Sequence, residues 1–168
     1  MRPIAKLSEL VDALEFSSDE YCTFFDRQSG NIVSVERFLL TVVEEGDQET
    51  LSRLPDWQRE EVEVARSIVN AEPDRFIDPP NKFDFHEYRH MERFIQSLPN
   101  ADAADQLWRT IKGRGAFRRF KDTAHRLGLL EQWDRYRDEA AAEFVRDWAK
   151  SNSVPVEDDI RPRGSRSQ

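Results

Sequence analysis

Cysteine and long apolar runs are scarce in this sequence, and each scarcity excludes a class of protein. The 168 residues include one cysteine, Cys22, so no disulfide can close within the chain and no cysteine cluster can hold a metal ion. No apolar run approaches the roughly 18 residues of a membrane span, and the first residues lack the apolar core of a signal peptide. We therefore expect a cytoplasmic protein with no membrane partner, in which Cys22 is a free thiol.

Positive charge is outnumbered, but it is concentrated in one segment. Lys and Arg number 25 against 33 Asp and Glu, which gives a net charge of −8 at pH 7. Residues 108–126 hold seven basic residues and one acid, so this segment has a charge of +6 and the rest of the chain has −14. This excludes a protein that coats nucleic acid with its whole surface. An anionic partner would meet only the basic segment, whereas a basic partner protein would meet acidic runs such as Glu44–Glu45 and Glu60–Glu63.

The first half of the chain predicts helices and a small antiparallel sheet. Apolar residues at helical spacing predict helices over residues 7–16, 38–43 and 56–71, whereas the polar residues 47–50 are expected to form a loop. Two β-favouring runs, residues 21–25 and 32–35, flank the turn signal Ser29–Asn31 and predict a hairpin. Residues 75–78 predict a third strand that stops before Pro79, because proline has no amide hydrogen to donate.

The second half of the chain predicts helices only. They are expected over residues 84–98, 101–112, 116–127 and 131–150, with breaks at Pro99, at Gly113 and Gly115, and at Gly128. The polar residues 152–168 are expected to form a disordered tail. The fold class is therefore α+β: one domain over residues 1–151, in which a three-stranded antiparallel sheet packs with a C-terminal helical bundle.

The predicted helix over residues 116–127 has the pattern of an anion-binding surface. Phe117, Phe120, Ala124 and Leu127 fall on one arc, and basic side chains fall on the other. The candidate anion-binding residues are Lys112, Arg114, Arg118, Arg119, Lys121 and His125. Arginine suits phosphate because its planar fork donates two parallel hydrogen bonds, so the partner would be a nucleic acid or another phosphate-bearing ligand. The alternative is internal: Arg118 and Lys121 could pair with Glu131, Asp134 or Asp138 of the next helix.

A metal-binding motif occurs earlier in the chain. His86-Glu87-Tyr88-Arg89-His90 matches H-E-x-x-H, in which two imidazoles one helical turn apart bind zinc and the glutamate acts as a base. On a helical wheel both histidines fall on the polar side, opposite Met91 and Phe94. We therefore favour a solvent-facing helix surface over a zinc hydrolase.

No complete catalytic constellation is present, so a non-enzymatic binding protein without a cofactor is the favoured interpretation. Asp138 and Glu139 are adjacent on a helix and point about 100° apart, so they cannot share a proton as a catalytic dyad does. We expect these two acids, with Arg137, to pair with the basic helix instead. A metal-dependent hydrolase and a purely protein-binding role remain the alternatives.

Several blocks of the sequence are shared with a known group of proteins. The block Gly113–Asp122, followed by Trp133, Tyr136–Glu139 and Trp148, resembles an uncharacterised family of bacterial proteins. The resemblance extends over residues 21–151. It implies an intracellular bacterial protein, and it assigns no catalytic residue. The second histidine of the H-E-x-x-H match is not a feature of that family, which further disfavours the zinc interpretation.

Overall fold

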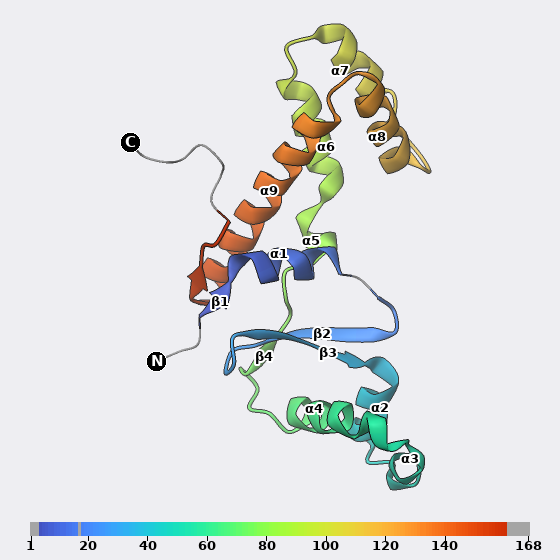
Figure 1. Cartoon of the computed structure of the whole chain (residues 1–168), viewed down its shortest axis with the longest axis vertical. Helices are drawn as coiled ribbons and strands as arrows, with labels where there is room; N and C mark the ends of the chain where they lie inside the picture. Colours follow the sequence, from blue (N-terminus) through green and yellow to red (C-terminus); the bar gives the residue numbers. More distant parts are fainter. Residues whose placement is uncertain (1–3, 17, 161–168) are drawn as a thin grey trace.

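The computed structural model describes residues 4–16 and 18–160, and it has the predicted α+β architecture. A three-stranded sheet lies toward one end of an elongated molecule and a group of helices forms the other end (Figure 1). The strands are β1 (Ala5–Lys6), β2 (Tyr21–Asp26), β3 (Asn31–Glu36), β4 (Phe76–Ile77) and β5 (Val156–Glu157). The helices are α1 (Leu7–Glu15), α2 (Arg37–Glu45), α3 (Gln48–Arg53), α4 (Arg59–Val69), α5 (Lys82–Phe85), α6 (Glu87–Ser97), α7 (Ala101–Trp108), α8 (Ala116–Arg126) and α9 (Leu130–Ser151), with a 3₁₀ turn at Asp56–Gln58.

The three-stranded sheet confirms the predicted hairpin and third strand. Its order is β3-β2-β4, and both pairings are antiparallel. The hairpin turns at Gly30, whose φ of 76° favours glycine. Because successive side chains of a strand point to opposite faces, Phe24 packs with α2 and α4, whereas Phe25 packs with α1 and α9. Helices therefore cover both faces of the sheet.

Helix α9 connects the group of helices α6, α7 and α8 to α1 and the sheet (Figure 1). Its 22 residues span about 33 Å. Its C-terminal half packs against α1 and the sheet through Ala141, Val145 and Ala149. Its N-terminal half places Trp133 in a second apolar cluster with α6, α7 and α8. No helix in the described part of the chain is both long and apolar enough to cross a membrane.

Three predicted elements differ in the structure. The helix expected over residues 101–112 ends earlier, at Trp108. The expected loop at residues 47–50 begins α3, because the Asp47 carboxylate accepts a hydrogen bond from Thr50 N–H at 3.1 Å and so caps the helix. The helix expected over residues 84–98 is broken at His86, which takes a left-handed conformation with φ 54° and ψ 63° between α5 and α6. Histidine is among the residues that adopt this conformation more readily than most.

The prediction of a disordered tail after Ser151 is wrong for residues 152–160. Val154 is buried, and β5 pairs in parallel with β1 to make a second, two-stranded sheet. Arg146 donates two hydrogen bonds to Asp158, at 2.9 and 3.2 Å, and Ser8 N–H donates to Asp159 at 2.8 Å. Ser8 and β1 lie about 150 residues away in sequence, so the polar composition of the segment does not indicate these contacts. The remaining predicted tail, residues 161–168, lies outside the described residues.

Candidate anion-binding surface

Helix α8 is held by one row of buried side chains. Ala116, Phe120 and Ala124 are buried, and the Phe120 ring meets the Trp133 ring edge-on at 4.9 Å between centroids. The predicted packing of Phe120 and Ala124 is thus confirmed. Phe117 was expected on the same arc, but it is 49% exposed. It lies at the edge of a buried row that runs through every fourth residue from Ala116.

The loop before α8 is fastened by an arginine of the helix itself. The Arg119 guanidinium donates to the backbone carbonyls of Lys112 and Arg114. Gly115 begins the helix with φ 73°, and a Cβ built there would lie 3.3 Å from Arg119 Nη1. Arg119 therefore stabilises the conformation of the loop. This role was not predicted, because Arg119 was expected to bind phosphate.

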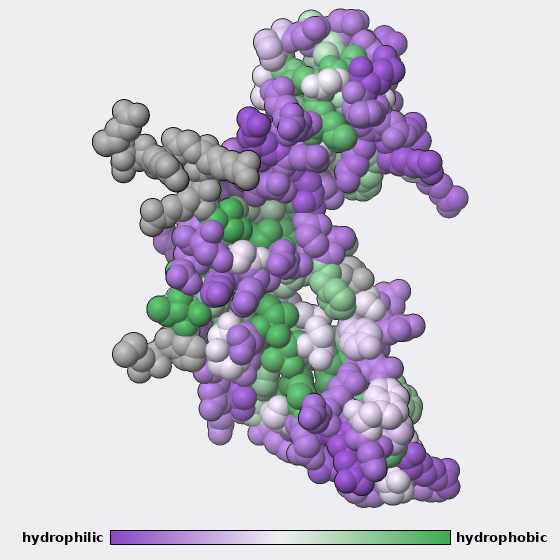
Figure 2. All heavy atoms as spheres, viewed as in Figure 1, coloured by the Kyte–Doolittle hydropathy of each residue, from purple (hydrophilic) through white to green (hydrophobic). Residues whose placement is uncertain are grey.

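The other five predicted residues lie on α8 and in the loop before it, and we call them together the basic face. Its members are Lys112, Arg114, Arg118, Lys121 and His125, and each is exposed. None of them forms an ion pair within residues 4–16 and 18–160. The internal alternative, in which Arg118 and Lys121 pair with acids of α9, is therefore not formed among the described residues. Figure 2 shows hydrophilic residues projecting where Figure 1 places the loop before α8.

Three exposed arginines of α3 and α4 behave differently. Arg53, Arg59 and Arg66 each meet an acid three or four residues away, at 2.7, 2.9 and 3.3 Å. Helix α8 contains a single acid, Asp122, so its cations lack such local partners. Unpaired cations on one helix face leave a local surplus of positive charge that attracts an anion.

An open hollow of about 730 Å³, which we call the aromatic hollow, adjoins the basic face. Its wall includes the ring of Phe117 from α8, that of Phe83 from α5 and that of Tyr88 from α6. Phe83 is 84% exposed and Tyr88 is 39% exposed. Lys82 and Arg89 also line it, and neither forms an ion pair among the described residues.

Sequence reasoning did not find the aromatic hollow, although one signal was present. Phe83 and Phe85 are two residues apart, so on a helical turn they point about 200° apart and one core cannot bury both. Phe85 is buried, and Phe83 therefore faces outward. Phe83 and Phe117 are far apart in sequence, so their placement around one hollow has no local signature.

The H-E-x-x-H residues do not lie on one continuous helix. His86 stands at the break between α5 and α6, and the Glu87 carboxylate accepts a hydrogen bond from Arg137. His90 was expected to face solvent, but it is half-buried and stacks on the Phe85 ring at 4.4 Å between centroids. Burial lowers the pKa of His90, aided by the charge of Arg93. No cluster of three or more metal-ligating side chains occurs among the residues that the structure describes.

Arg137 has a different partner from the one expected. It pairs with Glu15 of α1 at 2.7 Å and with Glu87 of α6, and so ties three helices together. Burial alone would lower the pKa of Arg137, but the hydrogen bonds to both carboxylates outweigh it and raise the pKa. Asp138 and Glu139 are exposed, and neither pairs with α8 within the described part of the chain.

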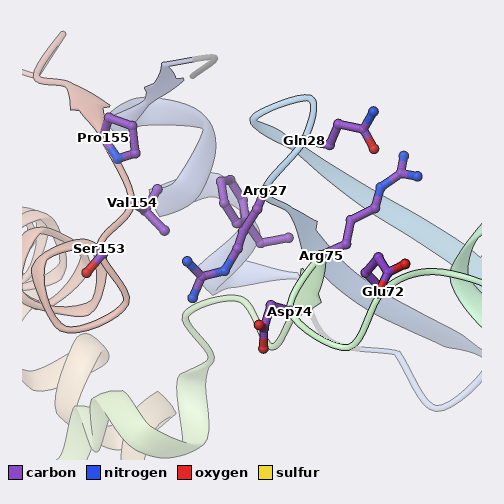
Figure 3. Close-up of a pocket in the computed structure, with 9 residues that line it drawn as sticks. Arg27, Gln28, Glu72, Asp74, Arg75, Ser153, Val154 and Pro155 are labelled. Carbon is purple, nitrogen blue, oxygen red and sulfur yellow. The ribbon is translucent and has the colours of Figure 1, made fainter. Parts of the chain in front are cut away.

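A second hollow, of about 590 Å³, lies at the end of β2 against residues 153–155. Figure 3 shows Arg27 and Arg75 pointing in opposite directions there. Arg75 pairs with buried Asp26 at 3.0 Å, whereas Arg27 Nε has no hydrogen-bond partner among the described residues. The carboxylates of Glu72 and Asp74 share this hollow, so it has no surplus of positive charge and does not extend the basic face.

Comparisons with known proteins give one match. The model of an uncharacterised protein family covers residues 1–163. No curated protein matches the chain, and no solved structure matches it. The match confirms that the chain resembles an uncharacterised family.

Proposed function

The chain belongs to the uncharacterised protein family UPF0158, and we propose that this member is a non-enzymatic, cytoplasmic binding protein whose basic face holds a phosphate-bearing partner. The observation that supports the proposal is the contrast between α8 and helices α3 and α4. Exposed arginines of α3 and α4 are paired locally, but the residues of the basic face form no ion pair among the described residues.

Phosphate fits this surface better than a single carboxylate does. Arg114 and Arg118 each present a planar fork that can donate two parallel hydrogen bonds to phosphate oxygens, and Lys112 and Lys121 add point charges beside them. The side chains are spread along the helix and its preceding loop, which favours a partner with several phosphates in series. Nucleic acid is the polymer that provides such a series.

Salt dependence tests this proposal. We expect wild-type protein to bind a fluorescein-labelled RNA of about 12 nucleotides in an anisotropy titration, with a site size typical of small modules. If four phosphates are neutralised, affinity should fall roughly 50-fold between 50 and 200 mM salt, because bound counterions are released. Binding that does not change with salt, or no binding of RNA, DNA or nucleotide at 50 mM salt, contradicts the proposal.

A further inference from the structure

We propose that the partner is a single-stranded nucleic acid, whose backbone follows the basic face while its bases stack in the aromatic hollow on Phe83, Tyr88 and Phe117. This inference rests on the proposed function and names the chemical class of its ligand. The wall of the hollow and the basic face meet at Phe117, which lies in sequence between Arg114 and Arg118.

The exposed rings are the first observation. A phenylalanine that is 84% exposed gains nothing from the apolar core, and it leaves nonpolar surface in water. Phe83, Phe117 and Tyr88 come from three different helices, yet they border one hollow of about 730 Å³, a volume in the range of ligand pockets. Flat aromatic ligands are what such a group of rings can stack against.

The charge around the rings is the second observation. Lys82 and Arg89 border the hollow without ion pairs among the described residues. Glu87 and Glu92 also border it, and Arg137 is shared between Glu87 and Glu15, so the two acids balance Lys82 and Arg89 at the hollow itself. Together with the basic face, the hollow has an excess of positive charge.

A single strand satisfies both observations. Its phosphates meet the cations, and its unstacked bases can lie on protein rings, an arrangement that supplies affinity with little sequence preference. Bases in a duplex are already stacked on one another and are not available to the rings. An acidic peptide would match the cations, but its carboxylates offer no flat ring to stack.

The test compares two double variants against three probes. Phe83→Ser/Phe117→Ser removes the rings, and Phe38→Ser/Trp57→Ser is the matched control, since Phe38 and Trp57 are 55% and 76% exposed on α2 and the 3₁₀ turn. The probes are a labelled single-stranded RNA of about 12 nucleotides, an abasic strand of the same length, and a duplex. Circular dichroism melting checks that each variant remains folded.

We expect wild-type protein to bind the single strand more tightly than the abasic strand or the duplex. Loss of two rings, at about 1 kcal/mol or more for each stacked base, should weaken single-strand binding at least about 30-fold and leave abasic binding unchanged, whereas the control variant should bind like wild type. Two results would overturn the stacking inference and leave the proposed function standing. In one, the wild-type protein binds all three probes equally and its affinity still falls with salt. In the other, the ring variant binds the single strand as tightly as wild type does. If the wild-type protein binds none of the three probes, both the stacking inference and the proposed function are overturned.

Discussion

Reversing three charges of the basic face is expected to weaken binding of single-stranded RNA at least about 100-fold without unfolding the protein. The variant is Arg114→Glu/Arg118→Glu/Lys121→Glu. Each wild-type residue is exposed and lacks an ion pair among the described residues, so replacing it breaks no ion pair there. A charge-assisted hydrogen bond to phosphate contributes about 1.5 kcal/mol or more, and each acid adds repulsion.

The matched control reverses three arginines at the other end of the molecule. Arg53→Glu/Arg59→Glu/Arg66→Glu changes the net charge by the same amount, and these side chains are also exposed. If affinity depended only on total charge, both variants would lose it equally. Anisotropy titration at 50 mM salt distinguishes the two cases, and equal losses would show that binding is not localised on α8.

The second large effect concerns stability and centres on Asp26. Its carboxylate is buried, and it accepts hydrogen bonds from Arg75 at 3.0 and 3.2 Å, from Gln28 N–H at 2.9 Å and from Ser29 Oγ at 2.9 Å. Asp26→Asn leaves the Arg75 cation without its partner beside the sheet. We expect the free energy of unfolding to fall by about 2–3 kcal/mol, since removal of one partner of a buried ion pair is strongly destabilising.

The contribution of Asp26 should also depend on pH. Burial raises the pKa of Asp26, but the hydrogen bonds from Arg75, Gln28 and Ser29 together outweigh burial, so the pKa lies below its ordinary value of 3.8. The stabilisation is therefore complete above about pH 4 and is lost as the pH falls through the lowered pKa. Urea unfolding between pH 7 and pH 3 should show a smaller acid-induced loss in Asp26→Asn than in wild type.

An exposed ion pair provides the control for Asp26. Glu49 pairs with Arg53 at 2.7 Å, but both side chains are more than two-thirds exposed. Because exposed pairs contribute little, Glu49→Gln should leave the urea midpoint almost unchanged. If Asp26→Asn had the same urea midpoint as wild type, the Asp26–Arg75 pair would not stabilise the end of the sheet.

Local signals predicted much of the fold. Gly46 and Gly128 end helices in left-handed conformations, as their positions after apolar helical patterns indicate. The hairpin and its turn at Gly30 are equally local. The contacts of residues 152–160 were not predicted: Ser8 and β1 lie about 150 residues away in sequence, and the pairing with Arg146 gave no pattern in the sequence.

The candidate site divides in the same way. Helical spacing placed Arg118, Lys121 and His125 on one face of α8 because periodicity needs only neighbouring residues. Two features were missed: the hydrogen bonds from Arg119 to the loop, and the placement of Phe83 and Phe117 around one hollow. The break at His86, which separates α5 from α6, gave no proline or glycine signal.

Mapping the bound surface on the intact protein tests the central claim most directly. Amide signals of ¹⁵N-labelled protein would be followed by NMR during titration with a single-stranded RNA of about 12 nucleotides. The account predicts shifted signals from Lys112 to His125 and from Lys82 to Arg89, with signals of α3 and α4 unmoved. Shifts confined to α3 and α4, or no shifts at saturating RNA and 50 mM salt, would contradict it.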